Sequence, residues 1–328
     1  MTRTLHLAFS LALFAIPATA QDAPSTTQAT PPALHSAAPI EERPPAAVFK
    51  VNTRLVNVFV NATGADGSPL GSLDRSDFRL LDDGQPQKLA VFERQSATPL
   101  SVSLAIDTSG SMIKDARLVR DAARQFIGDV IQPDDEMQVL QFAQTVDELA
   151  PFTSDPRRID SALRNLTEGE TTHMYDAVYL AAQGLASRRV TAADGVRKRV
   201  IVLITDGGDS GLGTSYDRAV EQALRAEAMI FSIIIVPIPA DAGRNTGGEH
   251  ALIQMALDTG GKYYYAESSA ALKDAFTHIS SDLRTQYLLG YYAPPRKPDS
   301  NFHAITVQLT DPARHDDSLR YRTGYYEH

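Results

Sequence analysis

Hydrophobic and polar residues follow two different patterns along this chain. In residues 48–98, valine at every second position of Val56–Val60 indicates strands with one buried face. The run Ile305–Leu309, within residues 287–328, alternates in the same way. Because a short terminal β segment cannot easily form its own core, we expect residues 48–98 and 287–328 to pack together in one small sandwich-like domain.

A turn signal divides the first β segment. Asp83-Gly84 is a dipeptide typical of tight turns, and apolar residues stand on both sides of it. We therefore expect a hairpin in which Phe78 and Leu80 pair across the turn with Leu89 and Val91.

The middle of the chain, residues 99–286, has continuous apolar runs instead. They cover Leu100–Ile106, Val200–Ile204 and Met229–Val236, and such runs are typical of strands buried on both faces of a parallel sheet. Apolar residues at helical spacing lie between the runs, for example over residues 112–126. Strands that alternate with helices predict βαβ units, so the expected fold class is α/β, with a doubly wound, mostly parallel sheet.

The first 47 residues have the features of export and linker segments. Arg3, the apolar run Leu7–Ile16 and the small-residue motif Ala18-Thr19-Ala20 have the layout of a signal peptide over residues 1–20. Residues 21–47 are rich in proline, alanine, serine and threonine, which predicts a disordered linker. We expect an exported protein, periplasmic or extracellular. No later apolar run is long enough to span a bilayer, so we expect no transmembrane segment after signal cleavage.

Composition excludes several classes of function. The 328 residues include 31 Lys+Arg and 40 Asp+Glu, a net charge of −9. They form no basic stripe, so we expect no nucleic-acid partner. The chain has no cysteine, which excludes disulfides, thiol catalysis and zinc–thiolate sites. The sequence makes no prediction about the oligomeric state.

Side-chain oxygens gather where predicted strands end. Asp107 ends the first apolar run, with Ser109 and Ser111 at alternate positions after it, and Asp206 follows another such run. Ligands of open α/β sheets bind beyond the carboxyl ends of the strands, so the two carboxylates are expected in one crevice. Thr172, in a loop before a predicted helix, could add a third hydroxyl. Hard divalent cations prefer such oxygen ligands. Asp-x-Ser-x-Ser alone would equally suit a helix N-cap.

With these residues in view, the chain resembles the von Willebrand factor A domain over roughly residues 98–286. That family has a metal-ion-dependent adhesion site (MIDAS) built from Asp-x-Ser-x-Ser, a distant Thr and a distant Asp. The matching positions are Asp107, Ser109, Ser111, Thr172 and Asp206. The family's Gly-Gly-Thr-x-Leu-Tyr-Asp-Ala reads Gly-Glu-Thr-Thr-His-Met-Tyr-Asp-Ala here, and the Tyr-Asp-Ala register favours Thr172 over Thr171.

A narrower resemblance concerns the flanks of this region. Tyr287-Leu-Leu-Gly-Tyr-Tyr and the final Gly324-Tyr-Tyr look like the exported A-domain-related proteins known from Acidobacteria.

The family resemblance implies a function in metal-mediated binding. It implies Mg²⁺ (or Mn²⁺), held directly by Ser109, Ser111 and sometimes Thr172, with Asp107 and Asp206 acting largely through water. An open coordination position would then take an Asp or Glu carboxylate from a partner protein. By the same resemblance, a shift of the last helix, about residues 268–284, could follow ligand binding.

Three interpretations of function stay open. The first is an exported, non-enzymatic adhesion or interaction module, and the second is a structural envelope module whose metal site is vestigial or only stabilising. The third is a metal-dependent hydrolase, which the lack of a general base other than the ligand carboxylates disfavours. We therefore predict no enzymatic activity.

Two nearby residues need a separate interpretation. Gly208-Asp-Ser-Gly211 resembles a serine protease nucleophile motif, but it follows a predicted buried parallel strand, and no Gly-x-Ser-x-Gly elbow surrounds Ser210. We interpret Asp209 as a solvated loop charge.

Overall fold

A six-stranded sheet organises the middle of the chain, in the order β10-β9-β8-β5-β6-β7. The strands in this order are β10 (Tyr263–Ala266), β9 (Ala228–Ile235), β8 (Lys198–Thr205), β5 (Leu100–Asp107), β6 (Glu136–Phe142) and β7 (Val146–Thr153). All neighbours are parallel except β6 and β7. Every residue of β5 and β9 is buried, as expected for strands covered on both faces. The predicted α/β fold class is confirmed.

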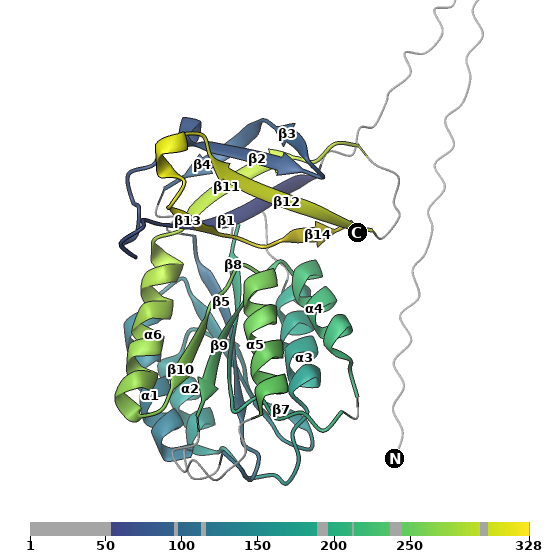
Figure 1. Cartoon of the computed structure of the whole chain (residues 1–328). Helices are drawn as coiled ribbons and strands as arrows, with labels where there is room; N and C mark the ends of the chain where they lie inside the picture. The colour runs from purple at the N-terminus through teal and green to yellow at the C-terminus, as the bar shows by residue number, and fades with distance from the viewer. Residues whose placement is uncertain are drawn as a thin grey trace, which may run out of the picture. The chain divides into compact units, whose positions relative to one another are not determined.

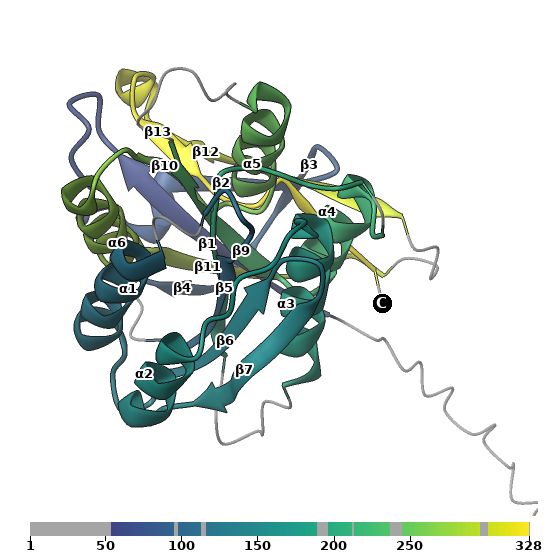
Figure 2. The same ribbon diagram turned by 90° about the horizontal axis from the view of Figure 1, so that it is seen from below.

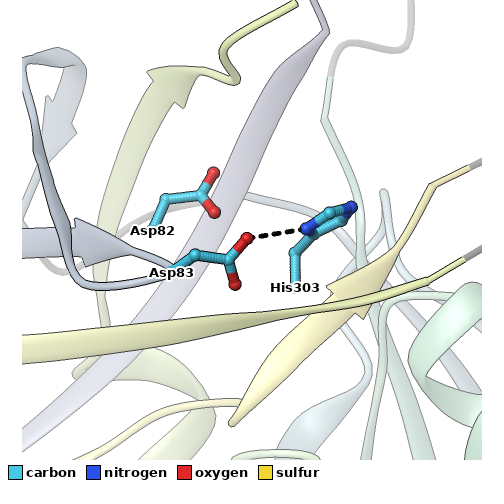
Figure 3. Close-up of side chains that lie close together, drawn as sticks. All are labelled: Asp82, Asp83 and His303. Atoms are coloured by element: carbon cyan, nitrogen blue, oxygen red, sulfur yellow. Dashed lines mark hydrogen bonds and ion pairs between the residues drawn. The ribbon is translucent and has the colours of Figure 1, made fainter. Parts of the chain in front are cut away.

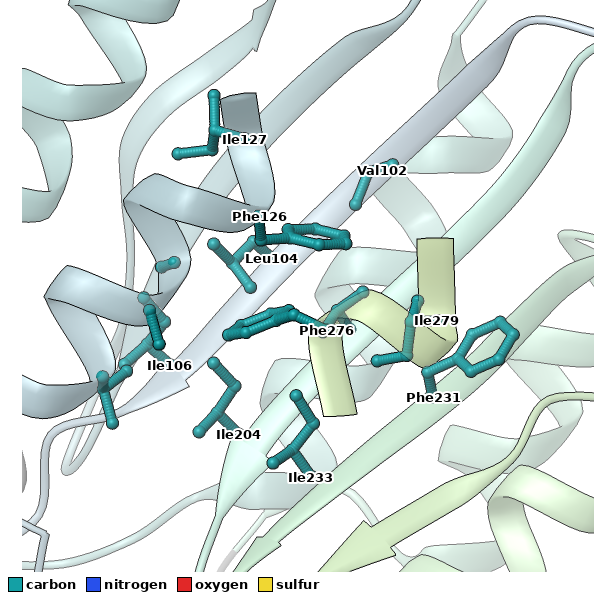
Figure 4. Close-up of a cluster of buried hydrophobic side chains, with 14 of the residues drawn as sticks. Val102, Leu104, Ile106, Phe126, Ile127, Ile204, Phe231, Ile233, Phe276 and Ile279 are labelled. Atoms are coloured by element: carbon teal, nitrogen blue, oxygen red, sulfur yellow. The ribbon is translucent and has the colours of Figure 1, made fainter. Parts of the chain in front are cut away.

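Helices cover both faces of this sheet. One face carries α1 (Ala116–Val130), α2 (Pro156–Arg164) and α6 (Ser269–Arg284), and the other carries α3 (Met174–Ser187), α4 (Tyr216–Arg225) and α5 (Thr246–Asp258). Figure 2 shows the two groups on opposite sides of the strands. In the first core, the Phe126 and Phe276 rings stack with centroids 4.6 Å apart (Figure 4). This aromatic pair joins α1 to α6 over the apolar side chains of the sheet.

Side-chain caps fix where several helices begin. Asp155 accepts a hydrogen bond from Arg157 N at 2.9 Å, with Pro156 at the first position of α2. Asn245 accepts from Gly248 N at 3.1 Å, and Ser268 from Ala271 N at 3.2 Å. Each cap satisfies a backbone N–H that has no partner within the helix.

Strands from both ends of the described chain form two further four-stranded sheets (Figure 1). The first has the order β13 (Ser318–Arg320), β1 (Leu55–Thr63), β11 (Tyr287–Tyr292) and β4 (Leu89–Glu93). The second has β14 (Gly324–Tyr326), β12 (Phe302–Leu309), β2 (Phe78–Asp82) and β3 (Gln85–Gln87). Short 3₁₀ turns at Arg75–Asp77 and Pro312–Arg314 complete this part, which we call the β sandwich.

Pairing in the β sandwich joins segments far apart in sequence. Val58 of β1 lies opposite Leu289 of β11, and Leu80 of β2 lies opposite Val307 of β12. All four side chains are buried in one shared core. The predicted domain boundaries at residues 98/99 and 286/287 stay predictions.

The predicted hairpin is wrong. The turn at Asp83-Gly84 does form, but Leu80 pairs with Gln87 of the short β3. Leu89 and Val91 belong to β4, which pairs with β11 in the other sheet. The physical reason is burial: β11 offers β4 a partner within the core, and such long-range pairing cannot be read from a local turn signal.

The structure is a computed structural model that describes residues 54–94, 98–112, 116–188, 196–211, 213–236, 245–295 and 301–327. The predicted signal peptide at residues 1–20 and linker at residues 21–47 lie outside these ranges and stay predictions. Within them, no helix has the length and apolar character needed to cross a membrane.

A buried lysine lies where the β sandwich meets the central sheet. Lys198, the first residue of β8, is fully buried, and its Nζ donates to Leu283 O of α6 at 2.5 Å. The ammonium also lies 5.2 Å from the ring centroid of Phe59 on β1. Asn61, also on β1, donates to Asp282 O at 2.9 Å. These contacts join α6 and the start of β8 to the β sandwich.

Replacing Lys198 should change how stability depends on pH. Burial, with a smaller effect of Arg284, lowers the Lys198 pKa from 10.5 to about 7. Between these values the unfolded chain binds more protons than the folded one, so stability rises with pH, by at most about 1.4 kcal/mol per pH unit. We expect the free energy of unfolding to increase from pH 7.5 to 9.5 in the wild type and to be flatter in Lys198→Met. Urea denaturation measures this.

The control is the exposed Lys273→Met on α6, which should keep the wild-type slope. Equal slopes for wild type and Lys198→Met would contradict the expectation.

Candidate metal centre

The Asp-x-Ser-x-Ser segment forms a compact turn at the end of β5. Asp107 is the last residue of the strand and is only 3% exposed. Its Oδ1 accepts a hydrogen bond from Ser109 N at 2.9 Å, and its Oδ2 accepts one from Thr205 Oγ1 of β8 at 2.5 Å. The Ser109 and Ser111 hydroxyl oxygens lie 3.2 Å apart. Three of the predicted ligands are therefore adjacent.

The other two predicted ligands, Thr172 and Asp206, both lie beside Gly208. A Cβ built on Gly208 would lie 3.3 Å from Asp206 Oδ1 and 3.5 Å from Thr172 Oγ1. Asp206 Oδ1 also accepts from Gly208 N at 3.0 Å. The negative charge of Asp206 acts on Asp107, which links the two groups of ligands. The structure thus brings all five predicted residues to the carboxyl edge of the sheet, where ligands of such folds bind.

Backbone contacts hold the loop before α3 against the strand ends. Gly169 N donates to Thr108 O at 3.0 Å, and His173 N donates to Ala143 O at 2.9 Å. A Cβ on Gly169 would lie 2.3 Å from the Ala143 Cβ, so the loop can approach this closely only with glycine there. The position of Thr172 therefore depends on backbone contacts with the residues that follow β5 and β6.

Sequence reasoning missed two residues that fix this loop, and the interpretation of Asp209 as a solvated loop charge is wrong. Asp209 Oδ1 accepts from Met174 N at 2.9 Å, so it caps the start of α3 from another loop. Ser210 N donates to Thr172 O at 2.7 Å, and Ser210 Oγ accepts from Thr172 N at 3.1 Å. The polar run after β8 was the only signal in the sequence.

The electrostatics at this edge of the sheet favour a cation. Burial raises the pKa of Asp107 to about 6, the charge of Asp206 adds to this, and hydrogen bonds from Ser109 and Thr205 oppose it. A buried carboxylate beside a second one is costly unless positive charge compensates it. The donors here are carboxylate and hydroxyl oxygens, which suit a hard divalent ion such as Mg²⁺. The five residues therefore fit the metal that the sequence predicts.

A second group of titratable residues lies in the β sandwich (Figure 3). Ligand atoms of Asp82, Asp83 and His303 are within 4.8 Å of one another. Asp82 Oδ2 accepts from Tyr291 Oη at 2.9 Å and from Tyr325 Oη at 3.0 Å, and Asp83 Oδ2 lies 2.8 Å from His303 Nδ1. Because Tyr291 belongs to one sheet and Asp82 to the other, these bonds join the two sheets. They account for the cluster in structural terms.

Comparison with known families supports the class of fold. Residues 102–208 match the family model for the von Willebrand factor type A domain, a range that contains all five predicted ligands. No curated protein matches the chain.

Several solved structures are similar at low identity. BatB, a conserved hypothetical protein from Bacteroides thetaiotaomicron, is 20% identical, with a TM-score of 0.44 over 56% of this chain and 98% of that one. An aerotolerance-related membrane protein from Bacteroides fragilis is 22% identical, with a TM-score of 0.43 over the same shares. Proximal thread matrix protein 1 from the mussel byssus, described with a zinc-occupied MIDAS motif, is 14% identical, with a TM-score of 0.44 over 58% of this chain and 49% of that one.

Removing the Ser210 hydroxyl should loosen the Thr172 loop. In Ser210→Ala the amide of Thr172 loses its acceptor, so we expect its hydrogen exchange to become about tenfold faster, equivalent to one net hydrogen bond. Amides of β5 and β8 should keep their protection, because the change is local. Exchange followed by NMR measures both.

The matched control is Ser187→Ala, which removes a hydroxyl bonded to Gly184 O at the far end of α3. It should leave the Thr172 amide unchanged. Unaltered exchange of Thr172 in Ser210→Ala would refute a positioning role for this serine.

Proposed function

We propose that this protein binds a divalent cation, Mg²⁺ or Mn²⁺, in the crevice at the carboxyl edge of the sheet and, through it, a carboxylate of a partner protein. The observation that carries the proposal is that the oxygen donors of Asp107, Ser109, Ser111, Thr172 and Asp206 lie at the carboxyl edge of the sheet. The family match over residues 102–208 supports it, because all five lie within that range. In this proposal the hydroxyls of Ser109 and Ser111 contact the ion.

The charge of the site supports a role in binding. With hydroxyl ligands in direct contact and carboxylates acting through water, a dication stays electron-poor and attracts an anionic ligand. His173, the histidine nearest to Thr172 in sequence, lies 3.1 Å from Asp176 and is engaged there. We therefore propose an interaction or adhesion module without enzymatic activity.

The sequence features of residues 1–20 support a proposal about where the protein acts. We propose that residues 1–20 direct export and that the protein acts in the periplasm or outside the cell. The sequence features of the flanking strands support a relationship with the exported A-domain-related proteins of Acidobacteria.

Removing the central carboxylate should weaken metal binding. We expect calorimetric titration to detect Mg²⁺ or Mn²⁺ binding to the wild type and an affinity about 10- to 100-fold lower for Asp107→Ala, because loss of an outer-sphere partner costs that much. The exposed Asp274→Ala on α6 is the charge-matched control and should bind like the wild type. Equal affinities of wild type and Asp107→Ala, or a wild type that binds neither ion, would refute the proposed site.

Partner binding separates the adhesion role from a structural one. Capture from the native cell envelope should lose its partner both in chelator and with Asp107→Ala. A partner retained under both conditions would instead favour a module whose metal only stabilises the fold.

Neutralising the same carboxylate should stabilise the metal-free protein. The raised Asp107 pKa means that the folded chain binds more protons than the unfolded one between pH 3.8 and about 6, so this group's contribution to stability falls as pH rises through that window. At pH 7 the cost is about 3 kcal/mol. We expect Asp107→Asn in chelator to be more stable than the wild type at pH 7 but not at pH 4. Urea denaturation at both values tests this, and a variant less stable at pH 7 would contradict it.

A further inference from the structure

A small cavity lies where the β sandwich meets the amino-terminal ends of β8 and β9, at the opposite ends of these strands from the candidate metal centre. Its volume is about 30 Å³. Its polar lining includes Asn57 of β1, Arg199 of β8, Glu227 before β9, and Arg322 between β13 and β14. A space of this size holds a water molecule or a small ion.

Arg322 is the residue that makes the cavity unusual. It is 6% exposed, and its Nη2 donates to Asn57 O at 2.7 Å. Among the residues that the structure describes, its Nε and Nη1 have no hydrogen-bond partner. Nη1 lies 3.5 Å from Glu227 Oε1, an ion-pair contact without hydrogen-bond geometry. Buried guanidinium donors without acceptors are costly, so the site calls for an acceptor in the cavity.

Positive charge exceeds negative charge around the cavity. The Glu227 carboxylate interacts with three guanidinium groups: it forms ion pairs with Arg54 at 3.0 Å and Arg322 at 3.5 Å, and it is attracted to Arg199 at longer range. Burial raises the Glu227 pKa, and these three arginines more than offset that effect, so the carboxylate is ionised and its pKa is low. One carboxylate against three guanidiniums leaves a local surplus of positive charge, which favours an anion over water in the cavity.

Asn57 lines the cavity beside Arg322. Its Oδ1, as oriented, has no hydrogen-bond partner within the described chain. Arg322 supplies the free donors from the β sandwich, while Arg199 supplies charge from the central sheet.

We propose that this cavity binds a small monovalent inorganic anion, of the size of chloride, which bridges the β sandwich and the central sheet. The anion accepts the free donors of Arg322 and neutralises part of the surplus charge. This site is independent of the proposed metal centre, so the failure of one leaves the other standing.

Bromide is the probe, because it replaces chloride and scatters anomalously. Crystals of the protein grown in sodium bromide should show an anomalous peak in the cavity, in contact with Arg322 Nε or Nη1. A cavity that contains only water, without an anomalous signal, would overturn the proposal.

A solution experiment tests the contribution to stability. In saturating sodium chloride the wild type should melt about 3 °C higher than in sodium gluconate of equal concentration, since an anion that binds only the folded state stabilises it. Arg199→Gln, which lowers the charge surplus, should lose most of this difference. Arg218→Gln, an exposed arginine on α4, is the matched control and should keep it.

A second variant keeps the test valid if Arg199→Gln unfolds. Asn57→Asp places a fixed carboxylate beside Arg322 and should make melting independent of the anion. Equal melting of the wild type in chloride and gluconate, or an unchanged chloride effect in Asn57→Asp, would overturn the proposal.

Discussion

Burial of β5 on both faces is the constraint on which the rest of the structure depends. A strand covered by helices on each side has room for polar groups only where it ends or where a partner side chain satisfies them. In β5 the carboxylate comes at the last residue, Asp107, and the hydroxyls of Ser109 and Ser111 follow in the turn. Helices packed on both faces therefore confine the chemistry of the central sheet to one edge, and the loops after β5 and β8 meet there.

Elements whose residues show a local sequence pattern could be predicted, whereas those that depend on contacts far along the chain could not. Mostly apolar runs identified β5, β8 and β9, because burial on both faces leaves room for few polar side chains. The strand β6 has no such run, since Glu136 and Gln138 interrupt its apolar pattern. These two side chains are buried and hydrogen bonded to Ser101 and Ser103 of β5, a pairing that exists only in the folded sheet. The failed hairpin around Gly84 has the same cause, because β11 competes for β4 from far along the chain.

The same distinction applies to the candidate site, where the ligands could be predicted and the residues that position them could not. Its oxygen donors could be proposed from residue types and spacing together with a family resemblance. The roles of Asp209 and Ser210 could not, because each acts on a backbone amide more than 30 residues away in the chain. Thr205 was missed for a related reason: its hydroxyl reaches Asp107 only because β8 lies beside β5. Residue type identifies a ligand, whereas the groups that orient it depend on tertiary structure.

The β sandwich is built from both ends of the described chain, with Leu55 opposite Tyr292 in its first sheet. The pairs β1–β11, β4–β11 and β2–β12 cannot form until the whole intervening sheet has been synthesised, and closing so long a loop is entropically costly unless that sheet is already compact. Folding should therefore proceed from the central sheet outward, and β1 and β4 must wait without their partner strand β11 meanwhile. Exposed strand edges invite association with other chains during that interval. The order of assembly, rather than the final stability, then sets the exposure of this protein to aggregation.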